Sequence, residues 1–135
     1  MSRRVVVTGG ASGIGARIAE RFAELGDQVV VCDANPDAVA AFAGSHPTIR
    51  AEVADVTQAD AMDVFLSAIE ADWSGVDVVF ANAGTGGPAA RIEDISPEDW
   101  RDCLAVNLDG AFLTCRWAAR IMRAQGSGLI FLTTS

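Results

Sequence analysis

Short apolar runs alternate with longer amphipathic stretches along this chain. The short runs are rich in β-branched and other apolar residues, which is typical of strands buried within a sheet. We expect β-strands at residues 5–7, 29–32, 48–53, 76–80 and 129–132.

The stretches between these runs carry apolar residues at helical spacing. The first covers residues 14–25 and is closed by Gly26, a residue that commonly ends helices. The second begins at Asn35-Pro36, with proline in its first turn. The third is expected to take Thr57 as its cap, and the fourth to run from Ser96 to about residue 124.

The alternation of strand and helix indicates the fold class. Apolar strands need cover on both faces, and right-handed crossovers then give a doubly wound α/β fold with a parallel sheet. Ligands of such sheets bind beyond the carboxyl ends of the strands. Polar or glycine-rich segments are predicted at that edge at 8–15, Asp33, Asp55, 82–84 and 133–135.

The first strand leads directly into a glycine-rich turn. Gly9 and Gly13 lack a Cβ, so the backbone can turn sharply, and Gly15 allows the next helix to pack closely. The N-terminus of that helix offers free N–H donors and a partial positive charge, which together bind phosphate groups. We expect a pyrophosphate to be bound by Thr8, Gly9, Ser12, Gly13, Ile14 and Gly15.

An acidic residue about 20 positions after such a turn binds the adenosine ribose. Asp33 lies 20 positions after Gly13 and ends the second predicted strand. A carboxylate there accepts bonds from both ribose hydroxyls and repels a 2′-phosphate. Neither Ser12 nor Ala34 supplies a compensating positive charge, so the sequence favours NAD over NADP.

Composition and charge narrow the classes of partner. The net charge is −8, which repels phosphate backbones, so we expect no nucleic-acid partner. No apolar run approaches the ~20 residues that span a bilayer, so no membrane partner is expected. The three cysteines form no CxxC pair and favour free thiols in the cytoplasm. No cluster of His, Cys and carboxylates has metal-ligand spacing, so no metal is expected.

These motifs closely resemble those of the short-chain dehydrogenase/reductase family, over all 135 residues. Residues 8–15 match the family's TGxxxGxG cofactor motif. Asp55-Val56 resembles the pair that contacts adenine, and Asn82-Ala83-Gly84 matches the NAG motif that steadies the sheet and lines the cofactor cleft. The resemblance implies that residues 1–135 form one partial Rossmann-type domain, roughly the N-terminal half of a usual family member.

The resemblance also implies hydride transfer between NAD(H) and a small-molecule secondary alcohol or ketone. Asn107 resembles the family's helix asparagine, which holds a water in a proton relay at a kink in the long helix. Ser135, 28 residues later, resembles the catalytic serine that hydrogen-bonds the substrate oxygen. Without the family, Asn107 could simply cap or kink a helix, and Ser135 could be an ordinary strand-end hydroxyl.

The family's proton donor has no counterpart in these residues. It is a Tyr in a Tyr-x-x-x-Lys pair beyond the serine, and the chain contains no Tyr and no Lys. We therefore expect the 135 residues to be a fragment that catalyses nothing measurable alone. A non-enzymatic dinucleotide-binding or interaction module is an alternative interpretation. A methyltransferase with a similar glycine turn is a third, although the NAG motif has no role there.

The long helix carries two apolar stripes, which indicates burial on two sides. One side covers the sheet, and the other meets the rest of the protein or a partner subunit, unless both belong to one wide core face. Family members commonly pair through this helix, so the resemblance implies a homodimer or homotetramer. The stripes are Leu104, Leu108, Ala111, Cys115, Ala119 and Met122, and Cys103, Val106, Gly110, Leu113, Trp117 and Ile121.

Overall fold

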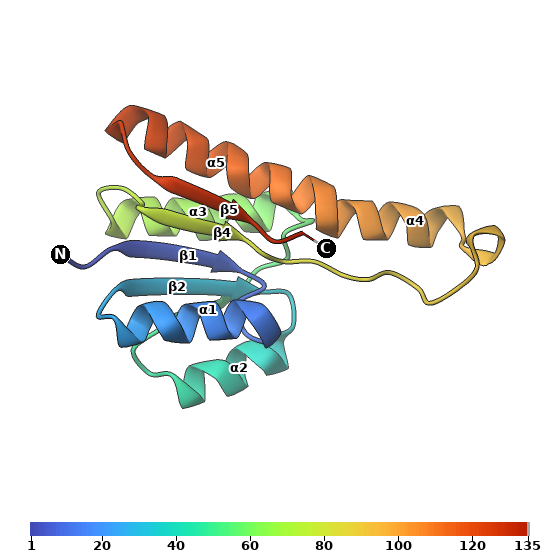
Figure 1. The fold of residues 1–135 in the computed structure, drawn as a ribbon, viewed down its shortest axis with the longest axis horizontal. Helices are drawn as coiled ribbons and strands as arrows, with labels where there is room; N and C mark the ends of the chain where they lie inside the picture. Colours follow the sequence, from blue (N-terminus) through green and yellow to red (C-terminus); the bar gives the residue numbers. More distant parts are fainter. Residues whose placement is uncertain (135) are drawn as a thin grey trace.

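The computed structural model describes residues 1–134 and contains one parallel sheet with helices on both faces (Figure 1). The strands lie in the order β3-β2-β1-β4-β5, and every adjacent pair is parallel. The prediction of a doubly wound α/β fold is confirmed. The strands are β1 (Arg4–Thr8), β2 (Gln28–Asp33), β3 (Arg50–Val53), β4 (Val78–Ala81) and β5 (Leu129–Leu132).

The helices form two layers around this sheet (Figure 1). Helices α1 and α2 cover one face, and α3 and α5 cover the other. Strand order reverses between β1 and β4, and doubly wound sheets bind ligands beyond the carboxyl ends of the strands at such a point. The helices are α1 (Gly13–Glu24), α2 (Pro36–Ser45), α3 (Ala59–Asp72), η1 (Ile92–Asp94), α4 (Pro97–Leu104), η2 (Ala105–Asp109) and α5 (Gly110–Gln125).

The central strand β1 supplies side chains to both layers of the core. Val6 packs in one cluster with Phe65 of α3 and Trp117 of α5. Val5 and Val7 belong to the opposite cluster, with residues of α1 and α2. All three valines are fully buried, which explains why the strand is a continuous apolar run and does not alternate.

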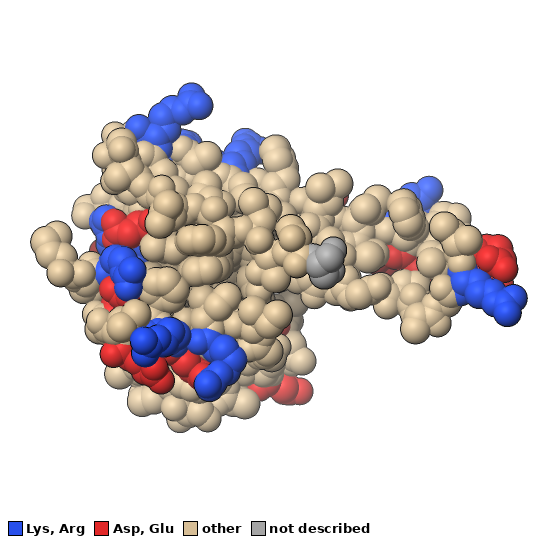
Figure 2. All heavy atoms as spheres, in the orientation of Figure 1, with Lys and Arg blue, Asp and Glu red and all other residues tan. Residues whose placement is uncertain are grey.

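The long helical segment after β4 is continuous but irregular. Ser96 caps it, because the serine hydroxyl accepts the Asp99 amide at 3.0 Å. The segment then passes through α4, the π-helical turn η2 and α5, so the predicted helix to about residue 124 is confirmed, and Asn107 lies on its π-helical turn. Its first part, α4, projects beyond the sheet as an arm (Figures 1 and 2).

The π-helical turn changes which residues of this segment face the core. Leu104 and Leu108 are 38% and 61% exposed, whereas Met122, predicted in the same stripe, is buried. Since a π-helical turn closes over one residue more than an α-helical turn, the faces before and after it are out of phase. The buried residues of α5 are Gly110, Thr114, Trp117, Ala118 and Met122.

Several element boundaries differ from the prediction, and β3 begins at Arg50 and not at Thr48. Thr57 does not cap α3, because its hydroxyl donates to Asp55 Oδ1 and Gln58 takes the cap position. Strand β4 begins at Val78 and not at Val76. Within residues 1–134, no helix combines the length and hydropathy that crossing a membrane requires.

Candidate dinucleotide-binding site

The turn between β1 and α1 has the backbone that its glycines predict. Gly9 and Gly13 have φ values of 61° and 55°, in the left-handed region that disfavours side chains. Ser12 is the extended N-cap of α1, and its exposed side chain makes no capping bond. Ile14 in the first turn is 64% exposed. The amides of Gly13 and Ile14, which have no partner inside the helix, therefore belong to exposed residues at the carboxyl edge of the sheet, whereas Gly15 and Ala16 behind them are buried.

Gly15 leaves no room for a side chain. A Cβ there would collide with the Gly9 carbonyl oxygen and lie 2.6 Å from Asn82 Nδ2. The expected close packing at Gly15 is confirmed, but the prediction that its partner is the first strand is wrong, since its neighbours are the turn itself and the residue after β4. Gly10 is equally confined, since its Cβ would lie 2.5 Å from the Cβ of Val31 in β2. The turn is thus pressed against both neighbouring strands.

Thr8 and Asn82 tie the turn to the end of β4. The Thr8 hydroxyl accepts the amides of Asn82 at 3.0 Å and Ala83 at 3.1 Å. In return, Asn82 Nδ2 donates to the carbonyls of Thr8 at 3.2 Å and Gly9 at 3.3 Å. Thr8 is only 1% exposed. These two predicted site residues therefore support the turn from behind.

Asp33 ends β2 beside the glycine turn, with its side chain half-buried. Its Oδ2 accepts the amide of Ala11 at 3.3 Å, and its Oδ1 accepts the amide of Asn35 at 3.1 Å. None of the ion pairs within residues 1–134 includes this carboxylate. Its negative charge is therefore held next to the turn and is not neutralised by a cation.

Asp55 and Val56 follow β3 and have different surroundings. Asp55 Oδ1 accepts the amide of Thr57 at 2.9 Å and its hydroxyl at 2.8 Å, which closes a local turn. Val56 is 5% exposed and packs on α5, where a Cβ on Gly110 would lie 2.5 Å from Val56 Cγ2. The Val56 side chain therefore belongs to the core, and a contact of this pair with adenine stays a prediction.

Asn107 lies on the π-helical turn and binds the loop after β4. Its Oδ1 accepts the amide of Thr85 at 2.8 Å, and its Nδ2 donates to the Thr85 carbonyl at 2.7 Å. The same nitrogen lies 3.3 Å from Cys103 Sγ. A Cβ on Gly84 would approach Asn107 Oδ1 to 3.0 Å, so a glycine at this position keeps the contact open. The side chain thus clamps the loop, and its role in a proton relay stays a prediction.

Ser135 lies outside the described residues, although the segment leading to it reaches the site. Thr133 Oγ1 donates to Asn82 Oδ1 at 2.8 Å. The sequence pattern placed residues 133–135 at this edge but assigned Thr133 no separate role. Thr85 carried no local signal, and Cys103 was predicted only as part of an apolar stripe, because their contacts with Asn107 depend on how the helix passes the loop.

The residues at this edge fit a dinucleotide. The exposed residues Gly13 and Ile14 at the start of α1 offer backbone donors to a diphosphate, and Gly13 carries no Cβ that would obstruct its approach. Asp33 accepts the Ala11 amide, so an acceptor for ribose hydroxyls adjoins the same turn. The site would therefore bind the diphosphate with the turn and the neighbouring sugar with Asp33.

Comparison with known proteins agrees with this geometry. A family model described as short chain dehydrogenase matches residues 3–135. D-threitol dehydrogenase of Mycolicibacterium smegmatis is 34% identical over 129 residues, which cover 93% of this chain and 49% of that protein. The chain spans about half the length of the curated relatives it matches.

Solved structures extend the likeness to three dimensions. An NAD+-bound xylitol dehydrogenase matches with a TM-score of 0.91 and 31% identity, over 98% of this chain and 53% of that one. A metagenomic short-chain oxidoreductase in complex with NADP matches with a TM-score of 0.91 and 29% identity, over 99% of this chain and 63% of that one. The chain therefore belongs to the short-chain dehydrogenase/reductase family, oxidoreductases that bind a nicotinamide dinucleotide.

Proposed function

We propose that this chain is the cofactor-binding part of an NAD-dependent oxidoreductase that acts on a secondary alcohol or ketone. The observation that carries the proposal is the Asp33 carboxylate, which adjoins the glycine turn and lacks a cationic partner within residues 1–134. A carboxylate there accepts bonds from ribose hydroxyls and repels a 2′-phosphate. Since relatives are bound to either cofactor, this charge is what favours NAD.

The proposed substrate class rests on the relatives. D-threitol dehydrogenase and xylitol dehydrogenase are both named for an alcohol. When bound, the nicotinamide would supply or accept the hydride. The chain's residues would hold the cofactor: the glycine turn at the diphosphate, Asp33 at the ribose, Asp55-Val56 at the adenine and Asn82-Ala83-Gly84 along the cleft.

The proton chemistry is assigned to residues near the end of β5 and on the long helix. Ser135 would hydrogen-bond the substrate oxygen, and Asn107 would contribute to a proton relay. A tyrosine donor would have to lie beyond these residues, which contain none. We therefore expect turnover only from the complete protein, and none from the 135 residues alone.

The variant Asp33→Ala in the complete protein tests the cofactor assignment. We expect the Kd for NADH to rise about 10- to 100-fold, since bonds from the ribose to a charged acceptor are lost. The Kd for NADPH should change less, because a repulsive charge is removed at the same time. Fluorescence titration with each cofactor measures both values.

A matched control separates this effect from a general loss of negative charge. Glu24 is an exposed carboxylate in the last turn of α1, at the opposite end of that helix from the glycine turn, and Glu24→Ala should leave both Kd values unchanged. Equal losses of NADH and NADPH affinity in Asp33→Ala would contradict the assignment to NAD. Binding of both cofactors with no dehydrogenase activity towards any alcohol would favour a non-enzymatic dinucleotide-binding module.

We also propose that the complete protein is a homodimer or homotetramer paired through α4 and α5. Leu104, Leu108 and Phe112 follow one another at intervals of four residues and are 38%, 61% and 59% exposed. An exposed apolar surface of this kind commonly marks an interface. Sedimentation of the complete protein and of Leu108→Arg tests the assignment, and the variant should dissociate to smaller species.

A cytoplasmic location is proposed from the thiols. Cys32, Cys103 and Cys115 are all free, and Cys32 is buried. Burial raises the pKa of the Cys32 thiol to about 12, so it is an inert core residue. Unpaired thiols are typical of reducing compartments. Cell fractionation with an antibody to the complete protein tests this location.

A further inference from the structure

The Asn82 carboxamide is the junction between the glycine turn and the strands beside it. Its nitrogen donates to the carbonyls of Thr8 and Gly9, at 3.2 and 3.3 Å. It also occupies the space next to Gly15, where a Cβ would come within 2.6 Å of it. The nitrogen side of this group is therefore fixed by the turn and by the first turn of α1.

The oxygen side of the same carboxamide is held by β5. Thr133, the first residue after β5, donates its hydroxyl to Asn82 Oδ1 at 2.8 Å. The Thr133 amide donates to the Ala81 carbonyl at 3.2 Å, which continues the ladder beyond the pair Ala81 and Leu132. One residue thus makes a backbone bond and a side-chain bond to consecutive residues of the β4 end.

Three of the four β5 side chains are exposed within residues 1–134. Leu129, Phe131 and Leu132 are 59%, 46% and 57% exposed, and β5 is the edge strand within residues 1–134. Phe131 does stack on Phe80 of β4, with ring centroids 4.9 Å apart. Beyond Leu132, the Thr133 amide and hydroxyl hydrogen-bond to Ala81 at the end of β4 and to Asn82 directly after it.

We propose that Thr133 is a positioning residue. Its hydroxyl couples the end of β5, and the segment leading to Ser135, to the glycine turn through the Asn82 carboxamide. The catalytic part of this inference rests on the proposed function, whereas the coupling itself does not. A strand end that shifts relative to the turn would misplace a substrate-binding hydroxyl relative to the cofactor, and this lowers turnover more than cofactor affinity.

The experiment compares Thr133→Val with Thr133→Ser in the complete protein. Valine has nearly the same shape but no hydroxyl, whereas serine keeps the hydroxyl. We expect hydrogen exchange of the Asn82 and Ala83 amides to be about 5- to 10-fold faster in Thr133→Val, which is the acceleration expected from the loss of one hydrogen bond. In Thr133→Ser, exchange should stay within about twofold of the parent rate.

Kinetics give the second measurement. In Thr133→Val, kcat should fall about 10-fold while the Kd for NADH changes less than about threefold, and Thr133→Ser should recover most of kcat. The control Thr48→Val makes the same hydroxyl-to-methyl replacement at an exposed threonine before β3. Its kcat and its hydrogen-exchange rates should match those of the parent. Unchanged exchange in Thr133→Val, or equal acceleration in Thr133→Ser, would overturn the coupling.

The two proposals fail in different ways. A parent protein that neither binds NADH nor oxidises an alcohol refutes the proposed function, while the exchange rates still decide whether Thr133 couples β5 to the turn. An active parent with unchanged kcat in Thr133→Val refutes the positioning role alone. A loss of kcat in Thr133→Ser as large as in Thr133→Val would also refute it, because the hydroxyl would not be the cause.

Discussion

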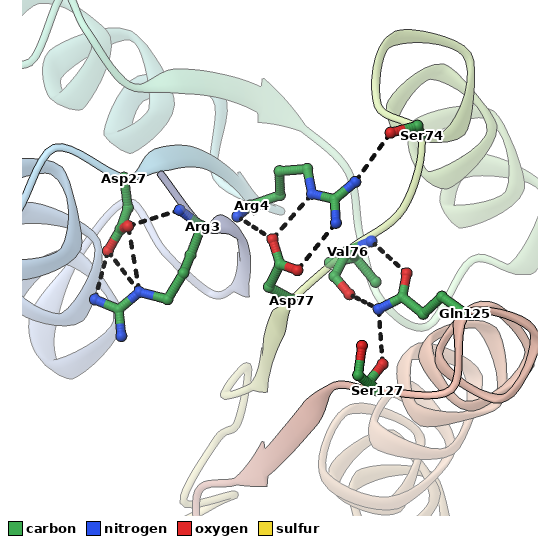
Figure 3. Close-up of polar contacts among 8 residues, drawn as sticks. All are labelled: Arg3, Arg4, Asp27, Ser74, Val76, Asp77, Gln125 and Ser127. Atoms are coloured by element: carbon green, nitrogen blue, oxygen red, sulfur yellow. Dashed lines mark hydrogen bonds and ion pairs between the residues drawn. The ribbon is translucent and has the colours of Figure 1, made fainter. Parts of the chain in front are cut away.

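Similar residues have different roles at the amino ends and at the carboxyl ends of the strands, which form the amino edge and the carboxyl edge of the sheet. At the amino edge, Asp27 accepts the amide and guanidinium of Arg3, and Asp77 accepts those of Arg4 (Figure 3). At the carboxyl edge, the hydrogen bonds that Asp33 accepts within residues 1–134 come from backbone amides, and Gly13 and Ile14 at the start of α1 are exposed. The amino edge satisfies its charges internally and so stabilises the fold, whereas the carboxyl edge keeps charges and donors open to a ligand.

A carboxamide joins the elements at each edge. At the amino edge, Gln125 Nε2 donates to the carbonyls of Val76 and Ser127, and its Oε1 accepts the Val76 amide at 3.3 Å (Figure 3). At the carboxyl edge, Asn82 has the corresponding role between the turn and Thr133. Both edges are therefore pinned by polar bonds, and the difference lies in the open glycine turn. Changes at the two edges should consequently separate binding from stability.

The largest expected effect is that of Gly15→Ala at the carboxyl edge. The added methyl group would collide with the Gly9 carbonyl, so the turn must move. We expect the free energy of unfolding to fall by about 1–3 kcal/mol and NADH affinity to fall at least about 100-fold. Urea denaturation and fluorescence titration of the complete protein measure these two quantities.

Gly44→Ala is the matched control, because a Cβ on this glycine of α2 meets nothing within 4 Å. Alanine is the better helix former, so stability should stay equal or rise by up to about 1 kcal/mol. NADH affinity should be unchanged. If both alanine variants bound NADH as the parent does, the glycine turn would not be the phosphate site.

The next effect in size belongs to the amino edge. Asp77→Asn removes the charge that accepts the amide and guanidinium of Arg4. We expect a loss of about 1–2 kcal/mol in the free energy of unfolding, with the Kd for NADH unchanged. Asp63→Asn, at an exposed position on α3, should change neither quantity. A large loss of NADH affinity in folded Asp77→Asn would erase the proposed contrast between the edges.

The smallest expected effect concerns how the free energy of unfolding depends on pH. Hydrogen bonds from Arg4 and Arg3 lower the pKa values of Asp77 and Asp27 below their ordinary range. Such carboxylates stabilise the fold above their unfolded pKa of about 3.9, and the contribution is lost as the pH falls through the lower folded pKa. Stability measured by urea denaturation should therefore decrease below about pH 4, and less steeply in Asp77→Asn. Equal slopes in the two proteins would contradict this origin.

Much of the fold could be predicted because its signals are local. The glycine spacing of residues 8–15 fixed the turn and its positive φ values. Ser96 and the proline after it marked the start of α4. The predicted cap of α3 was wrong because the Thr57 hydroxyl donates to Asp55. Composition does not reveal which of several nearby partners a threonine hydroxyl will bind.

The sequence by itself determined the parallel α/β fold, the glycine turn and the acid at the end of the second strand, because these rest on local patterns: apolar runs, the spacing of the glycines and an acid at a fixed offset from them. Only the tertiary structure decided that Asn107 binds the backbone of Thr85, that the Thr133 hydroxyl donates to Asn82, and that Asn82 leaves no room for a side chain at Gly15. Each of these contacts joins residues far apart in sequence. They exist only once β4 lies between β1 and β5, an arrangement set by the packing of the whole sheet.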